Sequence, residues 1–294
     1  MLKFTNVLVK YGNVTAVNIP GPLEIKRGDV VGIIGENGAG KSTLLNAIIG
    51  EAPYSGEIER EFSLETLGIQ FQQNSYNPLM TVREIIRMVF GRKFDSDLLD
   101  GIRRYELEPL LGSRIGKLSG GERQRLTLFL VLAVSKNPKS LYIFDELTTG
   151  LDFQKRQSMI ELVRQRTATS TVLITTHYFE ELSNWANKIL ILRRGRVVYF
   201  GSIDKLADEY PHDSVVKVSS DLALEEFNVE TRAAVLAVVH PGGGSIGLVV
   251  KTANDRRIVS SYLEQYHLSY SVELCGLYSY CMLATARDSE NSSV

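Results

Sequence analysis

The stretch that decides the fold reads Gly35-Glu36-Asn37-Gly38-Ala39-Gly40-Lys41-Ser42-Thr43. It matches the phosphate-binding loop pattern G-x-x-x-x-G-K-[ST], whose fixed positions are filled by Gly35, Gly40, Lys41 and Ser42. The apolar run before it, Val30–Ile34, predicts a buried strand, and the spacing of Leu and Ile over 42–49 predicts a helix. A strand, a glycine-rich loop and a helix in this order predict a site for the phosphates of a nucleotide.

The residue types in this loop suit that chemistry. Glycines let successive backbone N–H groups turn inward around a phosphate oxygen, and the helix that begins near Lys41 directs its positive end at the same anion. The Lys41 ammonium suits the β- and γ-phosphates, and the Ser42 hydroxyl is a ligand for Mg²⁺. We therefore expect a nucleoside triphosphate and Mg²⁺ at this loop, with Thr43 and the loop backbone in the binding site.

Two acids follow a second apolar run. Asp145 and Glu146 come directly after Leu141–Phe144, which predicts a buried strand with both carboxylates at its carboxyl end. Open α/β sheets bind ligands at that edge. Asp145 is expected to hold the Mg²⁺ shell, directly or through water, and Glu146 to activate the attacking water as a general base.

A third motif makes the set specific. Ser119-Gly120-Gly121-Glu122 opens a long predicted helix after Leu118 and so provides another anion-binding helix terminus. Together these motifs resemble the ATP-binding cassette (ABC) ATPases, with residues 118–126 similar to the family signature and Asp145-Glu146 similar to the end of its Walker B strand. The resemblance covers about residues 1–205 and keeps the family order.

The resemblance implies further site residues. Tyr11 matches the aromatic residue that stacks on adenine, Asp152 closes a D-loop at 148–152, and His177 matches the switch histidine that contacts the γ-phosphate. Gln72 matches the glutamine that ligates Mg²⁺; Gln73 is its neighbour, and we assign Gln72 because it directly follows Phe71. Leu147 stands where the family usually has proline, and Glu122 where glutamine is common.

In such ATPases two copies pair head to tail. The resemblance implies that the ATP on one copy is closed over by Ser119, Gly120 and Gly121 of the other, with Glu146, His177 and Lys41 carrying hydrolysis. It implies a homodimer and a separate transmembrane permease subunit. The runs 177–182 and 195–202 are similar to bacterial ABC-2 type exporters of drugs, lipids, peptides or ions, which favours export; an importer ATPase stays open.

Composition bounds the alternatives. The single uninterrupted cassette, without a heptad array or cysteine clusters, argues against a soluble ABC ATPase that acts on nucleic acid or the ribosome. The net charge of −1 gives no sign of a nucleic-acid-binding surface, and we expect no nucleic-acid partner. A phosphate-loop kinase or GTPase is disfavoured by the Ser-Gly-Gly motif. No stretch approaches the length of a membrane span, so we expect a protein at the cytoplasmic face of the membrane, held there by its partner.

The expected fold is α/β, a P-loop NTPase of the ABC ATPase type with a mixed sheet core, an antiparallel β subdomain and a helical subdomain at about 73–135. We place this domain at 1–208 and a small α+β accessory domain at 209–294. In the latter we expect strands at 215–218, 246–251 and about 277–284, and helices at about 222–236 and 255–266. The glycines at 242–244 predict a turn, because no Lys-Ser or Lys-Thr pair follows them.

Overall fold

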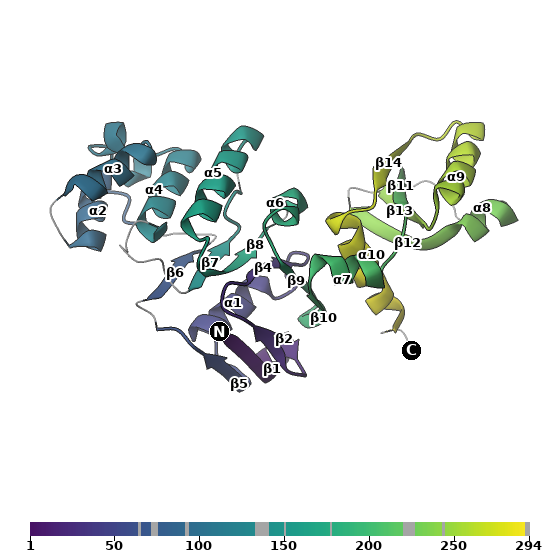
Figure 1. The fold of residues 1–294 in the computed structure, drawn as a ribbon, viewed down its shortest axis with the longest axis horizontal. Helices are drawn as coiled ribbons and strands as arrows, with labels where there is room; N and C mark the ends of the chain where they lie inside the picture. Colours follow the sequence, from purple (N-terminus) through teal and green to yellow (C-terminus); the bar gives the residue numbers. More distant parts are fainter. Residues whose placement is uncertain are drawn as a thin grey trace. The chain divides into compact units, whose positions relative to one another are not determined.

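The computed structural model describes residues 1–63, 66–71, 76–91, 94–132, 141–149, 151–176, 178–219, 227–242 and 245–291. These residues form two units (Figure 1). The first unit holds residues 1–33 and 40–187, and the second holds 34–39 and 188–294.

The first unit begins with an antiparallel sheet around β1 (Leu2–Tyr11). Its partners are β2 (Val14–Ile19), β3 (Leu23–Ile25) and β5 (Ser55–Arg60), all antiparallel to it. Helix α1 (Lys41–Ile49) contacts β1 and β2 and buries Leu44, Leu45 and Ile48. The antiparallel β subdomain expected at the N-terminus is therefore present.

A parallel sheet carries the acidic strand end. Its order is β4 (Val30–Ile34), β8 (Thr171–Thr175), β7 (Leu141–Asp145) and β6 (Leu67–Gln70). Every residue of β7 and β8 is buried, as expected for strands covered on both faces. Because Asp145 lies opposite Thr175 in the register, the carboxyl ends of these two strands place their polar residues side by side.

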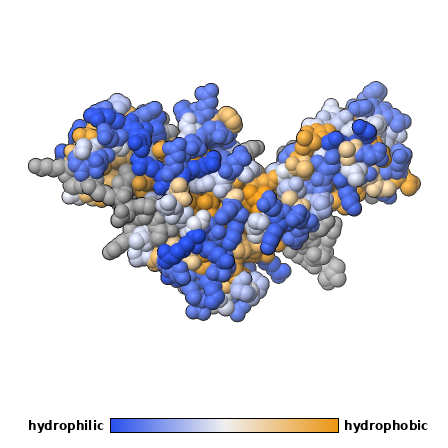
Figure 2. All heavy atoms as spheres, viewed as in Figure 1, coloured by the Kyte–Doolittle hydropathy of each residue, from blue (hydrophilic) through white to orange (hydrophobic). Residues whose placement is uncertain are grey.

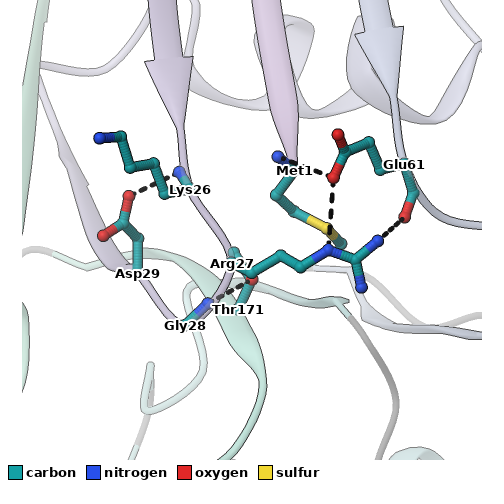
Figure 3. A network of polar contacts seen from close by, with 7 residues as sticks. All are labelled: Met1, Lys26, Arg27, Gly28, Asp29, Glu61 and Thr171. Atoms are coloured by element: carbon teal, nitrogen blue, oxygen red, sulfur yellow. Dashed lines mark hydrogen bonds and ion pairs between the residues drawn. The ribbon is translucent and has the colours of Figure 1, made fainter.

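The turn before β4 is fixed by polar contacts (Figure 3). The Gly28 N–H donates to Thr171 Oγ1 at 3.0 Å, and the Lys26 N–H donates to Asp29 Oδ2 at 2.7 Å. Arg27 Nε donates to Glu61 Oε2 at 3.3 Å, just past the end of β5. These contacts hold the start of β4 against the start of β8 and so fix the strand that leads into the glycine-rich loop.

The rest of the first unit is mostly helical. The helices there are α2 (Val82–Phe90), α3 (Ser96–Arg104), α4 (Gly120–Leu132), α5 (Phe153–Arg166) and the short α6 (Phe179–Ser183), with 3₁₀ turns at Glu108–Leu110 and Ile115–Lys117. Phe129 of α4 lies with its ring centroid 5.5 Å from those of Phe90 and Tyr105, which joins α2, α3 and α4. Both ends proposed for the helical subdomain, 73 and 135, lie outside the described residues.

The second unit contains a hairpin and a separate sheet. Strands β9 (Lys188–Arg193) and β10 (Arg196–Gly201) pair antiparallel, and α7 (Ile203–Glu209) follows. The sheet has the order β12 (Val235–Gly242), β13 (Ser245–Val250), β11 (Ser214–Ser219) and β14 (Tyr270–Leu274). Helices α8 (Val229–Ala234) and α9 (Ala253–Gln265) complete a βαββαβ order, and α10 (Leu277–Asn291) ends the chain's described part.

Parts of the expected C-terminal unit were wrong. The run at 277–284 forms the start of α10 and not a strand; β14 precedes it. The Gly276 N–H donates to Ser279 Oγ and the Tyr280 N–H to the Gly276 carbonyl, so a capped turn starts a helix there. Leu277, Cys281 and Ala284 are buried at the spacing of one helix face. The helix expected to reach 236 ends at Ala234, because Val235 already begins β12.

The helices also bear on the question of a membrane span. Over the stretches that the structure describes, none of them combines the length and the apolar composition that a bilayer crossing requires. The division of the chain into domains at 208/209 stays a prediction.

Candidate nucleotide site

The carboxyl ends of β7 and β8 bring three oxygen-bearing side chains together. Ser42 Oγ, in the first turn of α1, donates to Asp145 Oδ2 at 2.9 Å. Thr175 Oγ1 donates to Asp145 Oδ1 at 2.5 Å, and Asp145 is almost fully buried. The serine of the loop and the first acid of β7 therefore meet although they lie far apart in the sequence. Thr175 was not singled out by the sequence, because its role depends on the parallel register.

This pair of oxygens fits a Mg²⁺ ion. Neighbouring ligands in an octahedral Mg²⁺ shell, each about 2.1 Å from the metal, are about 3 Å from each other. Ser42 Oγ and Asp145 Oδ2 stand 2.9 Å apart, and both are the hard oxygen donors that Mg²⁺ prefers. The third expected ligand, Gln72, lies outside the described residues.

Lys41 opens α1 and is mostly buried. Burial lowers the pKa of its ammonium, and the charges of Glu146 and Asp145 oppose that shift. Gly40 before it has φ 105°, and a Cβ at Gly40 would lie 2.3 Å from the Ala16 carbonyl oxygen, so only glycine suits this position. The helix thus starts with a cation directly after a left-handed glycine, as the loop pattern predicts.

The first half of the loop belongs to the second unit. The Ala39 N–H donates to the Glu36 carbonyl at 3.1 Å, and Gly195 N–H donates to the Ala39 carbonyl at 3.0 Å. A Cβ on Gly35 would lie 2.4 Å from the Leu192 carbonyl oxygen. Residues 34–39 are therefore packed against the β9–β10 hairpin, which the sequence did not connect with the loop. Asn37 is exposed and Gly38 has φ 80°.

Glu146 adopts an unusual backbone conformation. Its φ is 54°, a region that non-glycine residues seldom occupy. Its N–H donates to Thr175 Oγ1 at 2.9 Å and to the Thr175 carbonyl at 3.1 Å, and its carboxylate accepts from Thr149 Oγ1 at 3.1 Å. Strain of this kind is held by surrounding contacts and gathers at functional sites. The conformation directs the chain sharply away from β7 directly after Asp145.

The Ser-Gly-Gly helix terminus is occupied by a side chain of its own helix. Ser119 Oγ donates to Glu122 Oε2 at 2.8 Å, the Ser119 N–H donates to the same oxygen at 2.7 Å, and the Glu122 N–H donates back to Ser119 Oγ at 3.3 Å. This is a capping box. The hydrogen bonds from Ser119 lower the pKa of the Glu122 carboxyl. A negative charge therefore already sits where the sequence predicts that a phosphate binds.

A groove of about 790 Å³ lies beside this terminus, between the start of α4 and the start of α5. Ser119, Gly121 and Glu122 line one side of it, and Leu151 and Asp152 line the other. Asp152 caps α5 by accepting from the Lys155 N–H at 3.0 Å, and an ion pair with the Lys155 ammonium at 2.6 Å helps lower its pKa. The signature and D-loop segments thus share one open surface of the first unit.

A buried carboxylate that the sequence did not single out joins the surrounding loops. Glu181 of α6 accepts from Thr148 Oγ1 at 2.8 Å and from Thr176 Oγ1 at 3.0 Å. Thr148 lies in the loop after β7, and Thr176 lies after β8, next to the position of His177. The buried position of Glu181 was hard to predict from the sequence, because a glutamate in a short amphipathic helix usually faces solvent.

The remaining expected site residues are placed only in part. Tyr11 ends β1 with 51% of its surface exposed, which leaves its ring available for stacking. His177 lies outside the described residues, as does Gly150 of the D-loop.

Comparison with known proteins gives a consistent result. Residues 21–149 match the family model described as ABC transporter. The chain is 33% identical over 229 residues to Nod factor export ATP-binding protein I of Burkholderia orbicola, covering 72% of this chain and 71% of that protein. It is also 33% identical over 222 residues to a probable sulfate/thiosulfate import ATP-binding protein CysA of Chlorella vulgaris, covering 69% and 92%.

A solved structure shows the same fold. The dimeric post-hydrolysis state of an ATP-binding cassette bound to ADP and Pi is 25% identical, has a TM-score of 0.58, and is matched over 69% of this chain and 98% of that one. With the phosphate loop, the acidic strand end and the Ser-Gly-Gly helix terminus in the expected order, this chain belongs to the ABC transporter family as an ATP-binding subunit with ATPase activity.

Proposed function

We propose that the protein powers export through a separate transmembrane subunit, and that it hydrolyses Mg-ATP at sites shared between two copies at the cytoplasmic face of the membrane. The observation that carries the ATPase site is the contact of Ser42 with Asp145 beside Glu146 and Lys41. Support for transport comes from relatives whose names describe export and import ATP-binding proteins.

Within one copy, we assign the roles of Lys41, Ser42, Asp145 and Glu146 from their chemistry, and those of Gln72, His177 and Tyr11 from the resemblance to the family. Ser42 and Asp145, with Gln72, would hold Mg²⁺, which would neutralise phosphate charge. Lys41 pairs with the β- and γ-phosphates, and the backbone N–H groups of the loop cup the same oxygens. Glu146 takes the proton of the attacking water. His177 contacts the γ-phosphate, and Tyr11 stacks on the adenine.

The second copy completes the site. Ser119, Gly120 and Gly121 present a helix terminus, and Asp152 lies on the same groove. One helix terminus cannot surround a triphosphate, whereas two opposed termini neutralise its charge from both sides. ATP then joins the two surfaces, and hydrolysis to ADP and phosphate weakens the joint.

A complementation experiment tests the shared site. Lys41→Ala removes the phosphate contact of one copy, and Ser119→Arg fills the groove of the other. Each variant alone is expected to be inactive, whereas the two co-expressed with different tags and purified together contain one intact site per mixed pair. Recovery of ATPase activity in the mixed protein supports the shared site. If activity does not recover although the Ser119→Arg variant binds ATP normally, the shared site is contradicted.

The general base is tested on its own. Glu146→Gln keeps the size of the side chain and is expected to lower kcat by about 10²-fold to 10⁴-fold, the usual contribution of a positioned base. ATP binding should remain. Glu51→Gln, an exposed acid at the end of α1, is the matched control and should leave kcat unchanged. Equal activity of both variants would remove Glu146 from this role.

Import is the second candidate, favoured by the similarity to the algal sulfate/thiosulfate import protein. Depletion of the chain from its own cells separates the two. Loss of a compound from the medium with its accumulation inside the cells is the result expected for an exporter. Depletion inside the cells with accumulation in the medium is the result expected for an importer. Cells that carry only the Glu146→Gln protein should behave like depleted cells.

A further inference from the structure

The βαββαβ part of the second unit has two outer strands. In the order β12-β13-β11-β14, the described sheet ends at β12 on one side and at β14 on the other. Helices α8 and α9 cover one face through a core that includes Val216, Leu248, Val259 and Leu263. The sheet therefore buries its face but leaves two edges with backbone groups available for pairing.

The two edges differ in how well they resist pairing. Strand β12 shifts register twice along β13 and contains Pro241, which has no N–H to donate. Strand β14 pairs with β11 over five consecutive residues without a shift, and its sequence Tyr270–Leu274 has no proline, glycine or lysine. Proteins usually blunt an edge with such features, and β14 lacks a register shift, a proline and a lysine.

Alternate residues of β14 direct their backbone N–H and C=O groups away from β11, toward the open edge. The Cys275 N–H donates to the Asp213 carbonyl at 3.0 Å. Since bonded pairs alternate along an antiparallel ladder, Glu273 and Ser271 also bond to β11, and the N–H and C=O groups of Val272 and its alternate neighbours point to the open edge.

The same alternate residues carry exposed apolar side chains. Val272 is 41% exposed and Leu274 is 66% exposed, although both lie on the face that packs against α8 and α9. Figure 2 shows a hydrophobic patch where Figure 1 places β14. An open backbone edge and an apolar row thus coincide on one strand.

We propose that β14 pairs antiparallel with β14 of a second copy, about a two-fold axis through Val272. In this register Val272 faces Val272 and Tyr270 faces Leu274, so the apolar row meets itself. Glu273, which pairs with Lys217 of its own sheet at 2.5 Å, faces Ser271 and not another acid. The strand is self-complementary in its apolar row and in its hydrogen bonding, with no two like charges opposite each other, and the joined sheet ends at a β12 strand on each side.

This pairing goes beyond the proposed function, because it needs no nucleotide. The mass of the full-length protein is measured by sedimentation equilibrium without nucleotide. We expect a dimer for the wild type and a monomer for Val272→Lys, which places two like charges opposite each other on the axis. The matched control is Leu236→Lys on β12, where the native side chain is 42% exposed, and it should remain a dimer. Thermal unfolding followed by circular dichroism, with the same midpoint as the wild type, shows that the variants are folded.

Cross-linking tests the register. Val272→Cys and Leu236→Cys are made in a Cys275→Ser background, which leaves only the buried Cys281. A short bis-maleimide should join two copies through position 272 and not through position 236. A monomeric wild type without nucleotide overturns the proposal, as does a Val272→Lys protein that stays dimeric. If the wild type is monomeric without nucleotide but the mixed Lys41→Ala and Ser119→Arg protein recovers ATPase activity, the β14 pairing is wrong and the proposed function stands.

Discussion

Glu122 shows how one residue can set the strength of a phosphate site. Its carboxylate caps the helix terminus that the proposed function assigns to the ATP of the second copy, and hydrogen bonds from Ser119 lower its pKa. The group therefore stays ionised at neutral pH, and an incoming phosphate meets a like charge. The common glutamine of the family keeps an accepting oxygen without that charge.

The prediction is that Glu122→Gln strengthens ATP-dependent activity. Removing a charge near a helix terminus should lower KM for ATP by about two- to fivefold. The advantage should shrink at acidic pH, because protonation of the wild-type carboxyl as pH falls through its lowered pKa removes the same charge. Glu84→Gln is the control, since Glu84 forms the same capping box with Thr81 on α2. Equal shifts in KM for both variants would contradict the prediction.

At the scale of elements, Glu181 connects α6 with the loops after β7 and β8. Its two oxygens accept from the Thr148 and Thr176 hydroxyls in a buried setting. Thr176 precedes His177, and Thr148 is the first residue of the D-loop at 148–152. A movement of either loop must therefore break its hydrogen bond to Glu181 or carry the Glu181 side chain with it.

We expect Glu181→Gln to lower kcat with little change in KM for ATP, because an amide nitrogen cannot accept one of the two hydroxyl bonds. The free energy of unfolding should fall by about 1–3 kcal/mol, the usual cost of an unsatisfied buried group. A double-mutant cycle with Thr148→Val, read in kcat, should be non-additive. Additive effects would show that the two residues act separately. Glu161→Gln, on an exposed part of α5, is the control.

Elements with strong local signals were predictable from sequence. Strand β7, helix α1 and the capping box that starts α2 follow apolar runs or capping patterns that need no partner. The strand predicted at 277–284 was wrong, because the aromatic-rich run after Gly276 has a composition that favours a strand while a local cap starts α10. The φ of Glu146 and one of the two partners of Glu181 depend on residues about 30 positions away, at Thr175 and Thr148, and no local pattern encodes them.

At the scale of the molecule, the second unit ties part of the phosphate loop to the C-terminal helix. Residues 34–39 contact the β9–β10 hairpin through the bond from Gly195 to Ala39, and α10 contacts the same hairpin. Arg193 Nη1 donates to the Thr285 carbonyl at 3.0 Å. Nucleotide bound to the loop should therefore stabilise α10 against opening, because a ligand of the closed state stabilises whatever closes with it.

The two cysteines report this linkage directly. Cys275 is exposed, whereas Cys281 is buried in α10 and burial raises the pKa of its thiol. With a disulfide reagent such as DTNB, one thiol should react at once and Cys281 only when α10 opens. In Cys275→Ser protein, a non-hydrolysable ATP analogue at 100 times its Kd should slow the Cys281 reaction by up to about 100-fold. The same analogue with Lys41→Ala, which weakens nucleotide binding, should give no slowing. If the rate of the Cys281 reaction is the same with and without nucleotide, although the protein binds nucleotide, then α10 opens independently of the loop. The hairpin would then not couple the phosphate site to the C-terminal sheet.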